Sequence, residues 1–437
     1  MTTSPMYFLW SVALALGLIL GLPYWLYQML RHGKYRQGLG ERLGCVPDRL
    51  RVGSNLPVIW VHAVSVGEVI AVTGLIEQLR AHSGRRIVVS TTTDTGQKLA
   101  RQKFGPENVF YFPVDLPFAV QPYLALLRPE MMVIAETEFW PNTLRAGKLA
   151  KAKIAVVNAR ISDKSLTGYI RFERLLSPVL NEIDLFLAQT AEDALRLKQI
   201  GAPEERIQVS GNLKFDAELP EPPEIAHTLK DQIAREGTGP VLVCGSTVEG
   251  EEPLLLGAYS NFLVAHPRSV MILAPRHPER FAEVAELLQR LSVAFIRRSL
   301  WNGESLAGKV LLLDSIGELT SLYGLADAAF VGGSLVARGG HNILEPARHG
   351  VPIIVGNHTE NFRDIVGLFE SRDAVRVVGP AELPLLLMHL FEKENEQERK
   401  GIGARAAETV RSQRGATART LEALEHLLPA RRGGASA

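Results

Sequence analysis

The sequence predicts an α/β protein built from two doubly wound domains behind an apolar N-terminal segment, and three observations predict this fold. Short apolar runs alternate with helical patterns, as in parallel sheets that are covered by helices on both faces. The alternation pauses at a proline-rich stretch, residues 219–224, and then begins again. A chain of 437 residues, 46% of them hydrophobic, also exceeds the size at which one core usually divides into domains.

Residues 1–30 are predicted to form a membrane anchor. No charged side chain precedes Arg31, and residues 7–30 are long enough to cross roughly 30 Å of hydrocarbon as a helix. The first cationic cluster, Arg31, Lys34 and Arg36, follows this segment, so the positive-inside tendency places the rest of the chain in the cytoplasm. A cleavable signal peptide would have the reverse charge order. Pro23 leaves open a shallow monotopic helix instead of a full span.

Ten apolar runs are predicted as strands, five on each side of a linker at residues 219–239. They are residues 58–63, 86–91, 131–135, 154–158, 185–189, 241–244, 269–274, 310–313, 328–331 and 353–355. The linker combines three prolines with a polar, helix-like stretch that ends at Gly239. The predicted domains are residues 31–218 and 240–430, followed by a disordered tail at 431–437. Ligands of open parallel sheets bind beyond the carboxyl ends of the strands, so the site is expected in a cleft between the domains.

Composition excludes several classes of function. The 48 lysines and arginines balance 47 acidic residues, so no nucleic-acid partner is expected. Cys45 and Cys244 lie outside any CxxC spacing, which argues against a zinc site or a disulfide framework and fits a reducing compartment. No HExxH or Asp-x-Asp pattern is present, so metal-independent chemistry is favoured, and the histidines near the motifs are expected to be hydrogen-bonding loop residues. These are His62, His277, His341 and His358.

Three acids and one lysine are the candidate chemical groups of the first domain. Glu68 lies in the first turn of a helix that follows the strand at 58–63, and the choice between a general base and an ordinary first-turn acid stays open. Glu136 and Glu138 follow the strand at 131–135. Such closely spaced carboxylates are suited to handling protons, but one of them could instead cap the following helix. Lys214 precedes the linker, and a solvated lysine is its default interpretation.

In the second domain, the candidates are suited to binding an anion. Arg276 follows the strand at 269–274 and can contact a phosphate or carboxylate, whereas Arg280, one turn further on, is expected to be structural. A glycine-rich run at residues 332–340 precedes a helix predicted to start near Asn342, whose free N–H groups would suit a phosphate. Glu345 would bind ribose hydroxyls there, although its spacing from Asn342 also fits a capping box.

Taken together, these segments resemble one family, the 3-deoxy-D-manno-octulosonic acid (Kdo) transferases of lipopolysaccharide assembly, over most of the chain. Eleven segments match in order, and each one alone is a weak signal. They are HAVSVGEV, STTTDTGQ, PVDLP, ETEFWPN, NARISDKS, GNLKFD, GSTVEGEE, APRHPERF, SIGEL, FVGGSLVARGGHNILEPA and the pair Asn361-Phe362. The resemblance implies a GT-B architecture and an inverting, metal-independent transfer of Kdo from CMP-Kdo to lipid IVA, without a cofactor, at the cytoplasmic leaflet of the bacterial inner membrane.

The same resemblance implies roles for individual residues. Glu68 would be the general base, and Glu136 and Lys214 would help to stabilise the transition state, which reverses the default interpretation of Lys214. The remaining matched positions would hold CMP. They are Pro275, Arg276, Ile316, Gly317, Glu318, Asn342, Ile343, Leu344 and Glu345.

Two other functions remain open at this stage. A UDP-sugar transferase or epimerase would have a similar fold, and fold alone does not select the donor. A membrane-bound binding protein that has lost the chemistry is the second alternative, although every position needed for catalysis carries a competent side chain. The number of Kdo units, the acylation of the acceptor, a related octulosonic acid as the sugar, and the oligomeric state are not encoded in any motif.

Overall fold

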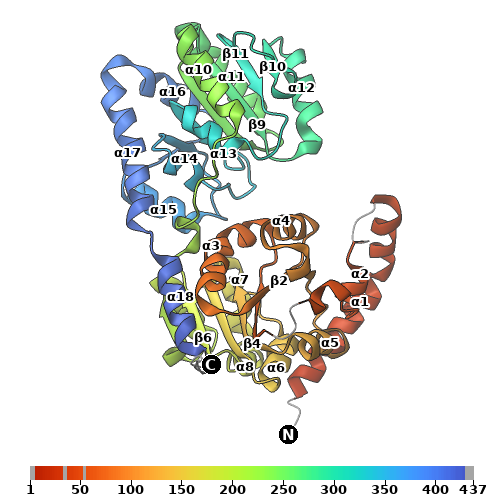
Figure 1. Cartoon of the computed structure of the whole chain (residues 1–437). Helices are drawn as coiled ribbons and strands as arrows, with labels where there is room; N and C mark the ends of the chain where they lie inside the picture. Colours follow the sequence, from red (N-terminus) through yellow and green to blue (C-terminus); the bar gives the residue numbers. More distant parts are fainter. Residues whose placement is uncertain (1–4, 33–36, 53–55, 429–437) are drawn as a thin grey trace, which may run out of the picture. The chain divides into compact units, whose positions relative to one another are not determined.

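A computed structural model describes residues 5–32, 37–52 and 56–428 (Figure 1). The chain forms two compact units, each built around its own sheet. Unit 1 comprises Met1–Ala217 together with Gln413–Ala437, and unit 2 comprises Glu218–Ser412. The α/β fold predicted from the sequence is therefore confirmed.

Unit 1 contains a seven-stranded parallel sheet in the order β3-β2-β1-β4-β5-β6-β7. Its strands are β1 (Val58–His62), β2 (Arg86–Thr91), β3 (Val109–Tyr111), β4 (Pro129–Ala135), β5 (Lys153–Ala159), β6 (Leu185–Ala188) and β7 (Ile207–Val209). Its helices are α1 (Pro5–His32), α2 (Leu39–Arg42), α3 (Val66–Ser83), α4 (Asp94–Phe104), α5 (Pro117–Leu127), α6 (Pro141–Leu149), α7 (Asp163–Arg171), α8 (Glu173–Leu180), α9 (Ala191–Gln199) and α18 (Ala416–Leu427).

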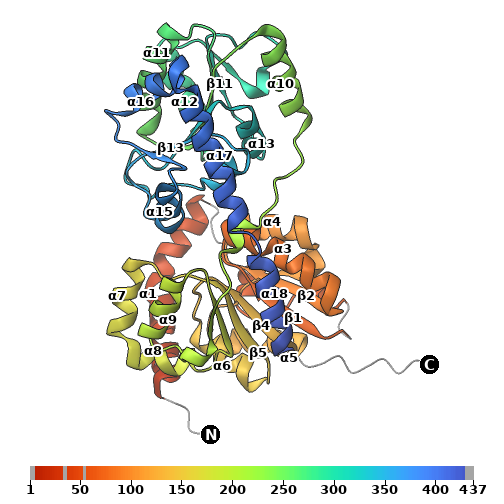
Figure 2. The ribbon, with the colours of Figure 1, turned by 90° about the vertical axis from the view of Figure 1, so that its left-hand side faces the viewer.

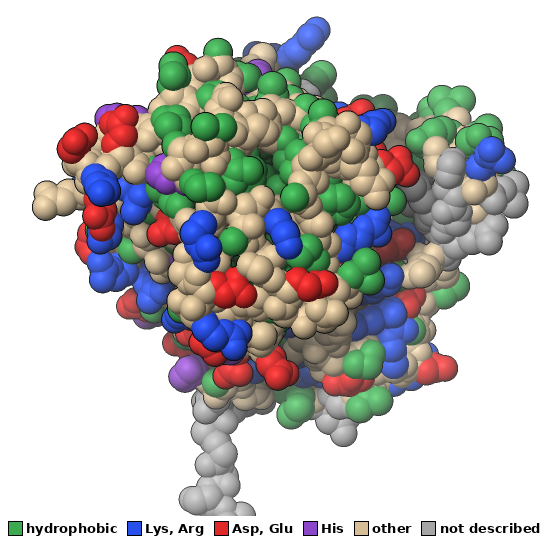
Figure 3. All heavy atoms as spheres, turned by 90° about the horizontal axis from the view of Figure 1, so that it is seen from above, with side chains coloured by type: hydrophobic (Ala, Val, Ile, Leu, Met, Phe, Trp, Pro, Cys, Tyr) green, Lys and Arg blue, Asp and Glu red, His purple; other side chains and the backbone are tan. Residues whose placement is uncertain are grey.

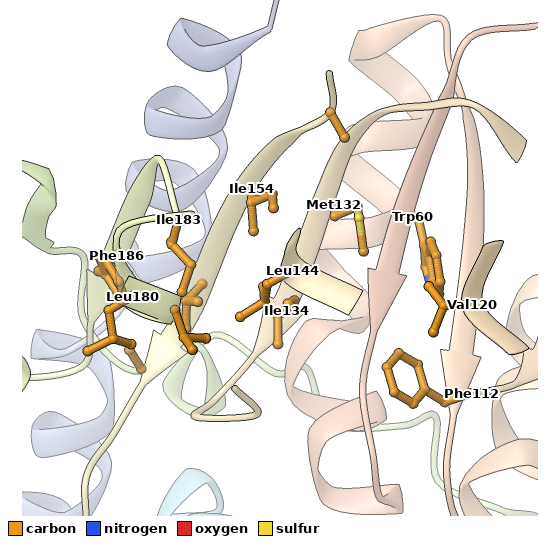
Figure 4. Close-up of a cluster of buried hydrophobic side chains, with 14 of the residues drawn as sticks. Trp60, Phe112, Val120, Met132, Ile134, Leu144, Ile154, Leu180, Ile183 and Phe186 are labelled. Atoms are coloured by element: carbon orange, nitrogen blue, oxygen red, sulfur yellow. The ribbon is translucent and has the colours of Figure 1, made fainter. Parts of the chain in front are cut away.

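Alternate residues of these strands enter two separate cores, as the two-residue period of a strand requires. Trp60 and Met132 point to the face that α5, α6 and α8 cover (Figure 4). Their neighbours Val61 and Val133 point to the opposite face, where α3, α4 and α18 pack. Burial on both faces explains why the strands read as continuous apolar runs in the sequence.

Unit 2 repeats this plan with the strand order β10-β11-β9-β8-β12-β13-β14, all parallel. Its strands are β8 (Val241–Thr247), β9 (Val270–Pro275), β10 (Phe295–Arg297), β11 (Lys309–Leu312), β12 (Ala328–Val331), β13 (Ile353–Val355) and β14 (Arg376–Val377). Its helices are α10 (Glu224–Glu236), α11 (Glu251–Ala265), α12 (Phe281–Arg290), α13 (Leu319–Leu322), α14 (Leu344–Arg348), α15 (Arg363–Ser371), α16 (Leu383–Phe391) and α17 (Glu396–Ser412).

The ten predicted strands are all confirmed, and four short strands that the sequence did not reveal join them: β3, β7, β10 and β14. One predicted range is wrong at its end. Residues 240–430 do not form one domain, because the chain returns to unit 1 from Gln413 on. The predicted linker, residues 219–239, carries α10, whose Leu229 is fully buried in a core of unit 2. The predicted tail at 431–437 and the cations Lys34 and Arg36 lie outside the described residues.

The return of the chain is fixed by polar contacts as well as by packing. The Asp216 carboxylate accepts hydrogen bonds from the backbone N–H groups of Gly415 (2.7 Å) and Thr417 (2.5 Å). Arg419 donates to the carbonyl oxygen of Ser210 at 2.8 Å. Helix α18 then lies beside α3, and buried Leu424 fills the core between them (Figure 2). The C-terminal helix is thus part of unit 1.

Charged side chains of both signs are interspersed on the surface, as Figure 3 shows for one face. This distribution agrees with the near balance of 48 basic and 47 acidic residues. An anionic ligand must therefore be met by local groups rather than by a strongly basic surface.

Candidate active site

Each sheet has one point at which the strand order reverses, and the motifs follow the strands beside that point. In unit 1 it lies between β1 and β4, and in unit 2 between β8 and β12. Loops from two such strands diverge to opposite faces of the sheet, which leaves a crevice beyond their carboxyl ends. Glu68 follows β1 and Glu136 follows β4, so the topology itself brings these two acids to one place.

Glu68 stands at the start of α3 and is held there by its own turn. One carboxylate oxygen accepts from the Ser65 hydroxyl (2.9 Å), and the other accepts from the backbone N–H of Val64 (2.7 Å). The Ser65 side chain in turn caps the helix by accepting from the N–H of Glu68. The first-turn acid expected from the sequence therefore also holds the turn that precedes the helix, and its side chain is fixed by these bonds.

The environment of Glu68 favours a carboxyl group that exchanges protons near neutral pH. Its side chain is 9% exposed, and burial is the main cause that raises the pKa of Glu68 to about 7. The nearby negative charge of Glu136 raises it further. A carboxyl whose pKa lies near the working pH combines a usable fraction of base with a strong drive to accept a proton.

Glu136 and Lys214 form an ion pair in unit 1. Lys214 Nζ lies 3.0 Å from Glu136 Oε1, and each side chain is only about a quarter exposed, at 25% and 28%. Glu136 has a positive φ of 59°, a conformation that costs a side-chain-bearing residue energy and recurs at functional sites. The default interpretation of Lys214 as a solvated lysine is wrong, because the fold pairs it with a motif acid.

Lys214 is presented by a rigid turn. Asn212 accepts from the N–H of Lys214 (2.9 Å), and its amide group donates to Gln189 (2.8 Å). The next link is Asn158, at φ 54°, which accepts from the N–H of Leu213 (2.9 Å). Asn158, near the end of β5, and Gln189, directly after β6, thus hold the turn that carries the lysine, which limits the reach of an otherwise flexible cation.

The loop between β4 and α6 is held by Asp115, a residue that the sequence analysis did not single out. Its buried carboxylate accepts from the backbone N–H groups of Asn142 (3.1 Å) and Thr143 (2.7 Å), and so caps α6 from another part of the chain. Neither Glu136 nor Glu138 caps this helix, which removes the structural alternative for them. Burial and the charge of Glu136 raise the pKa of Glu138.

In unit 2 the predicted anion-binding segments also converge. Arg276 is exposed directly after β9. The pKa of His341 is lowered to about 4, mainly by burial of its ring and next by the positive charge of Arg276. His341 belongs to the glycine-rich segment and packs against Gly333, so two separate motifs meet here. Arg280 pairs with the buried carboxylate of Glu252 at 2.6 Å, in agreement with the structural role expected for it.

The remaining two segments, residues 316–318 and 342–345, are joined by hydrogen bonds. Glu345 accepts from the hydroxyl of Thr320 (2.8 Å), in the helix that follows Glu318, and from the amide of Asn342 (3.3 Å). Glu318 pairs with Arg298 at 2.8 Å. The helix predicted to start near Asn342 is present and starts two residues later. Helix α14 begins only at Leu344 and has five residues, because Asn342 instead makes a local turn by accepting from the N–H of Leu344.

Glu251 is the main residue of unit 2 that the sequence did not reveal. Its fully buried carboxylate accepts from the backbone N–H groups of Val248 (3.0 Å), Gly333 (2.8 Å), Ser334 (2.9 Å) and Leu335 (2.9 Å). These donors come from the loops after β8 and β12, the two strands beside the switch point. The segment GSTVEGEE was recognised only as one of the segments that match the family, and no role was predicted for its acids.

Histidines contribute no metal cluster to the part of the chain that is described. Residues 5–32, 37–52 and 56–428 contain no group of three or more His, Cys, Asp or Glu arranged to hold a metal ion. His62 is a buried strand residue rather than the loop residue expected. Its ring stacks on Phe112 at 3.9 Å, and burial lowers its pKa to about 3.

Comparison with known proteins identifies the class and then the family. At 15% identity and a TM-score of 0.58, a UDP-GlcNAc 2-epimerase from Neisseria meningitidis covers 85% of this chain and is itself covered completely, which shows the shared GT-B fold. A transferase from Haemophilus influenzae, 3-deoxy-D-manno-octulosonic acid transferase, is 35% identical over 410 residues, 90% of this chain and 92% of the relative. One of the same description from Bordetella pertussis is 36% identical over 398 residues.

The fold and the relatives define a glycosyltransferase. A family model described as 3-deoxy-D-manno-octulosonic-acid transferase (kdotransferase) matches residues 37–217, which include Glu68, Glu136 and Lys214. The chain belongs to the Kdo transferase family of lipopolysaccharide biosynthesis.

Proposed function

We propose that this chain transfers Kdo from CMP-Kdo to lipid IVA by an inverting, metal-independent reaction at the cytoplasmic leaflet of the inner membrane. The observation that carries the proposal is that Glu68 and the Glu136–Lys214 ion pair lie beside the same switch point. The pKa of Glu68 is raised to about 7 at this position. Unit 1 would take the acceptor and unit 2 the nucleotide.

The proposed reaction is a single displacement. The acceptor hydroxyl oxygen attacks the anomeric carbon of Kdo, while the bond from that carbon to the CMP phosphate breaks and CMP leaves with the electron pair. Glu68 takes the hydroxyl proton. Lys214, oriented by Glu136, would stabilise negative charge near the reacting centre, because a fixed cation needs no reorganisation when that charge develops.

In unit 2, CMP would be held by residues after β9, before α13 and around the start of α14. Arg276 would pair with the phosphate, next to Pro275. The turn Ile316–Gly317–Glu318 and the segment Asn342–Ile343–Leu344–Glu345 would contact the nucleoside, with Glu345 available to ribose hydroxyls. CMP leaves as a phosphate monoester, so a cation at that position suffices without a metal-bound diphosphate.

The transfer itself is the direct test. The purified protein is incubated with lipid IVA and CMP-Kdo generated in situ, and the lipid is followed by mass spectrometry. A gain by whole Kdo units is expected and also counts the transfers. No gain with folded protein would reject the proposed donor and acceptor, and would direct attention to other nucleotide sugars.

The nucleotide preference gives a separate prediction. CMP is expected to raise the melting temperature of the wild-type protein, whereas UDP is not, and Arg276→Gln is expected to weaken the CMP effect by about tenfold in affinity through loss of a charged contact. Arg290→Gln, at the end of α12, is the control. Stabilisation by UDP alone would favour a UDP-sugar enzyme.

The pH dependence tests the assignment of the base. A base with a pKa of about 7 is protonated in acid, so kcat/KM is expected to fall about tenfold per pH unit below pH 7. Glu136→Gln removes a negative charge that raises the pKa of Glu68. The acidic limb of its pH–rate profile, where kcat/KM falls with falling pH, should therefore lie at lower pH than in the wild type, even if the maximal rate of the variant is reduced. Glu138→Gln should move the limb in the same direction by less, because its charge is the weakest of the causes. An unchanged limb in Glu136→Gln would mean that another group titrates.

A further inference from the structure

Helix α1 is tied to unit 1 by its first turns. The Tyr7 hydroxyl donates to Glu182 (3.1 Å), the Trp10 indole donates to Asp115 (2.8 Å), and Ser11 exchanges hydrogen bonds with the Asn142 side chain (3.0 and 3.3 Å). Tyr7 is 8% exposed and belongs to the core on the α6 face of the sheet. The N-terminal end of α1 is therefore packed as part of a folded domain.

The other end of α1 is connected to the same unit. Only six residues lie between His32 and Leu39, so these two positions are seven residue steps apart, a reach of about 25 Å when fully extended. Helix α2 begins at Leu39 and is anchored by Glu41, which accepts from the N–H of Tyr111 at 2.9 Å. The first turns of α1 are thus docked on unit 1 and its last residue is tethered within about 25 Å of the same unit, although a helix of 28 residues is about 42 Å long.

The two faces of α1 differ along its whole length. Residues 7, 10, 11, 14, 18, 21 and 25 are buried or half-buried. The opposite face carries exposed apolar side chains at a spacing of three to four residues, among them Phe8 (70% exposed), Ile19 (64%) and Leu20 (80%). No charged residue lies between Met6 and Met29, a segment long and apolar enough to cross a membrane by length and composition.

A membrane-spanning helix must have its ends in opposite aqueous phases, which these contacts do not allow. We infer that α1 is a monotopic element, with both ends on the side of the catalytic units and its exposed apolar face buried in one leaflet of the bilayer. The chemistry of that face selects lipid as its occupant, because it is apolar and uncharged and is followed by the exposed cation Arg31. Pro23 lies inside the helix and is exposed on this outward face. The inference concerns topology and does not depend on which sugar is transferred.

Cross-linking in native membranes tests the docked state. Tyr7→Cys and Glu182→Cys are combined in a Cys45→Ser background, where the remaining Cys244 is buried, and are treated with a short bismaleimide. An internal cross-link is expected, because a spanning helix would place residue 7 roughly 30 Å away across the hydrocarbon. The matched pair Leu20→Cys with Glu182→Cys is expected to give none, because Leu20 lies on the other face and about 20 Å along the helix.

A second measurement reports the side of the membrane without disturbing the contacts. Green fluorescent protein, fused before Met1 of the full chain, fluoresces in the cytoplasm but not after export in unfolded form. Retained fluorescence in the membrane fraction, together with the cross-link, is the expected result. Loss of fluorescence would overturn the monotopic arrangement, and so would failure of the cross-link in membranes that contain a variant which still transfers sugar. Release of the wild-type protein from membranes by salt would refute the buried apolar face.

Discussion

Replacing Glu68 by glutamine is expected to reduce kcat by about 10²–10⁴-fold while leaving the fold intact, because the amide cannot accept the acceptor's proton. The contacts of the side chain survive the change. The amide oxygen still accepts from the N–H of Val64, and the amide nitrogen can donate to the Ser65 hydroxyl. Transfer to lipid IVA under single-turnover conditions, followed by mass spectrometry, measures the chemical step directly.

Stability provides an internal check on the same variant. The pKa of Glu68 in the folded chain, about 7, lies above its ordinary value of 4.5, so the folded state binds the proton more tightly. The wild-type free energy of unfolding should therefore fall as pH rises from about 4.5 to 7, and this fall should be absent in Glu68→Gln. Glu77→Gln, an exposed acid on the same helix, is the control. A Glu68→Gln variant with near-normal turnover would exclude Glu68 as the base.

Replacing Glu251 by glutamine is expected to destabilise unit 2 by about 3 kcal/mol or more. Each carboxylate oxygen accepts two backbone N–H groups, and an amide nitrogen in place of one oxygen would leave two buried donors without an acceptor. Each such donor costs about 1–3 kcal/mol, which for a unit of this size corresponds to a melting temperature lower by roughly 6–12 °C. Calorimetry or far-UV circular dichroism measures the shift.

The same variant should also lose affinity for CMP, because the turn at Gly333 that supports His341 depends on this carboxylate. Glu249→Gln, two residues earlier and exposed, should change neither property. If Glu251→Gln melted like the wild type and also bound CMP normally, the carboxylate would not be the organising group of this switch point. A glycine is required beside it, since a Cβ at Gly332 would lie 2.8 Å from a Glu251 oxygen and 2.4 Å from the carbonyl oxygen of Ser246.

The longer buried strands could be predicted well from the sequence. Both faces of each sheet are covered, so nearly every residue of such a strand is apolar. The missed strands have two or three residues, as in β14 (Arg376–Val377), and carry too few side chains to show a period. The place of α18 was wrong for a different reason. Its contacts with Asp216 and Ser210 join residues about 200 positions apart, and no local pattern reports such a pairing.

In the site, the groups that follow strands were easier to find than the buried acids that hold the loops. Glu68, Glu136 and Arg276 follow strands, so their chemistry and position could be read together. Asp115 and Glu251 were missed, because an acid whose partners are distant backbone N–H groups looks like any surface acid in the sequence. Lys214 was assigned through family resemblance alone, since its partner Glu136 lies 78 residues away.

The return of α18 to unit 1 has a consequence for biosynthesis. Leu424 and Ala416 complete the core against α3, yet they are synthesised only after the whole of unit 2. Unit 2, encoded between the two parts of unit 1, can acquire its full core earlier, whereas the N-terminal sheet keeps an open apolar face until α18 has been synthesised. A premature stop just before Gln413 would therefore leave unit 2 complete, although the stop lies at its end, and would deprive unit 1 of α18. The truncation would damage the unit that begins the chain and not the unit beside the new C-terminus.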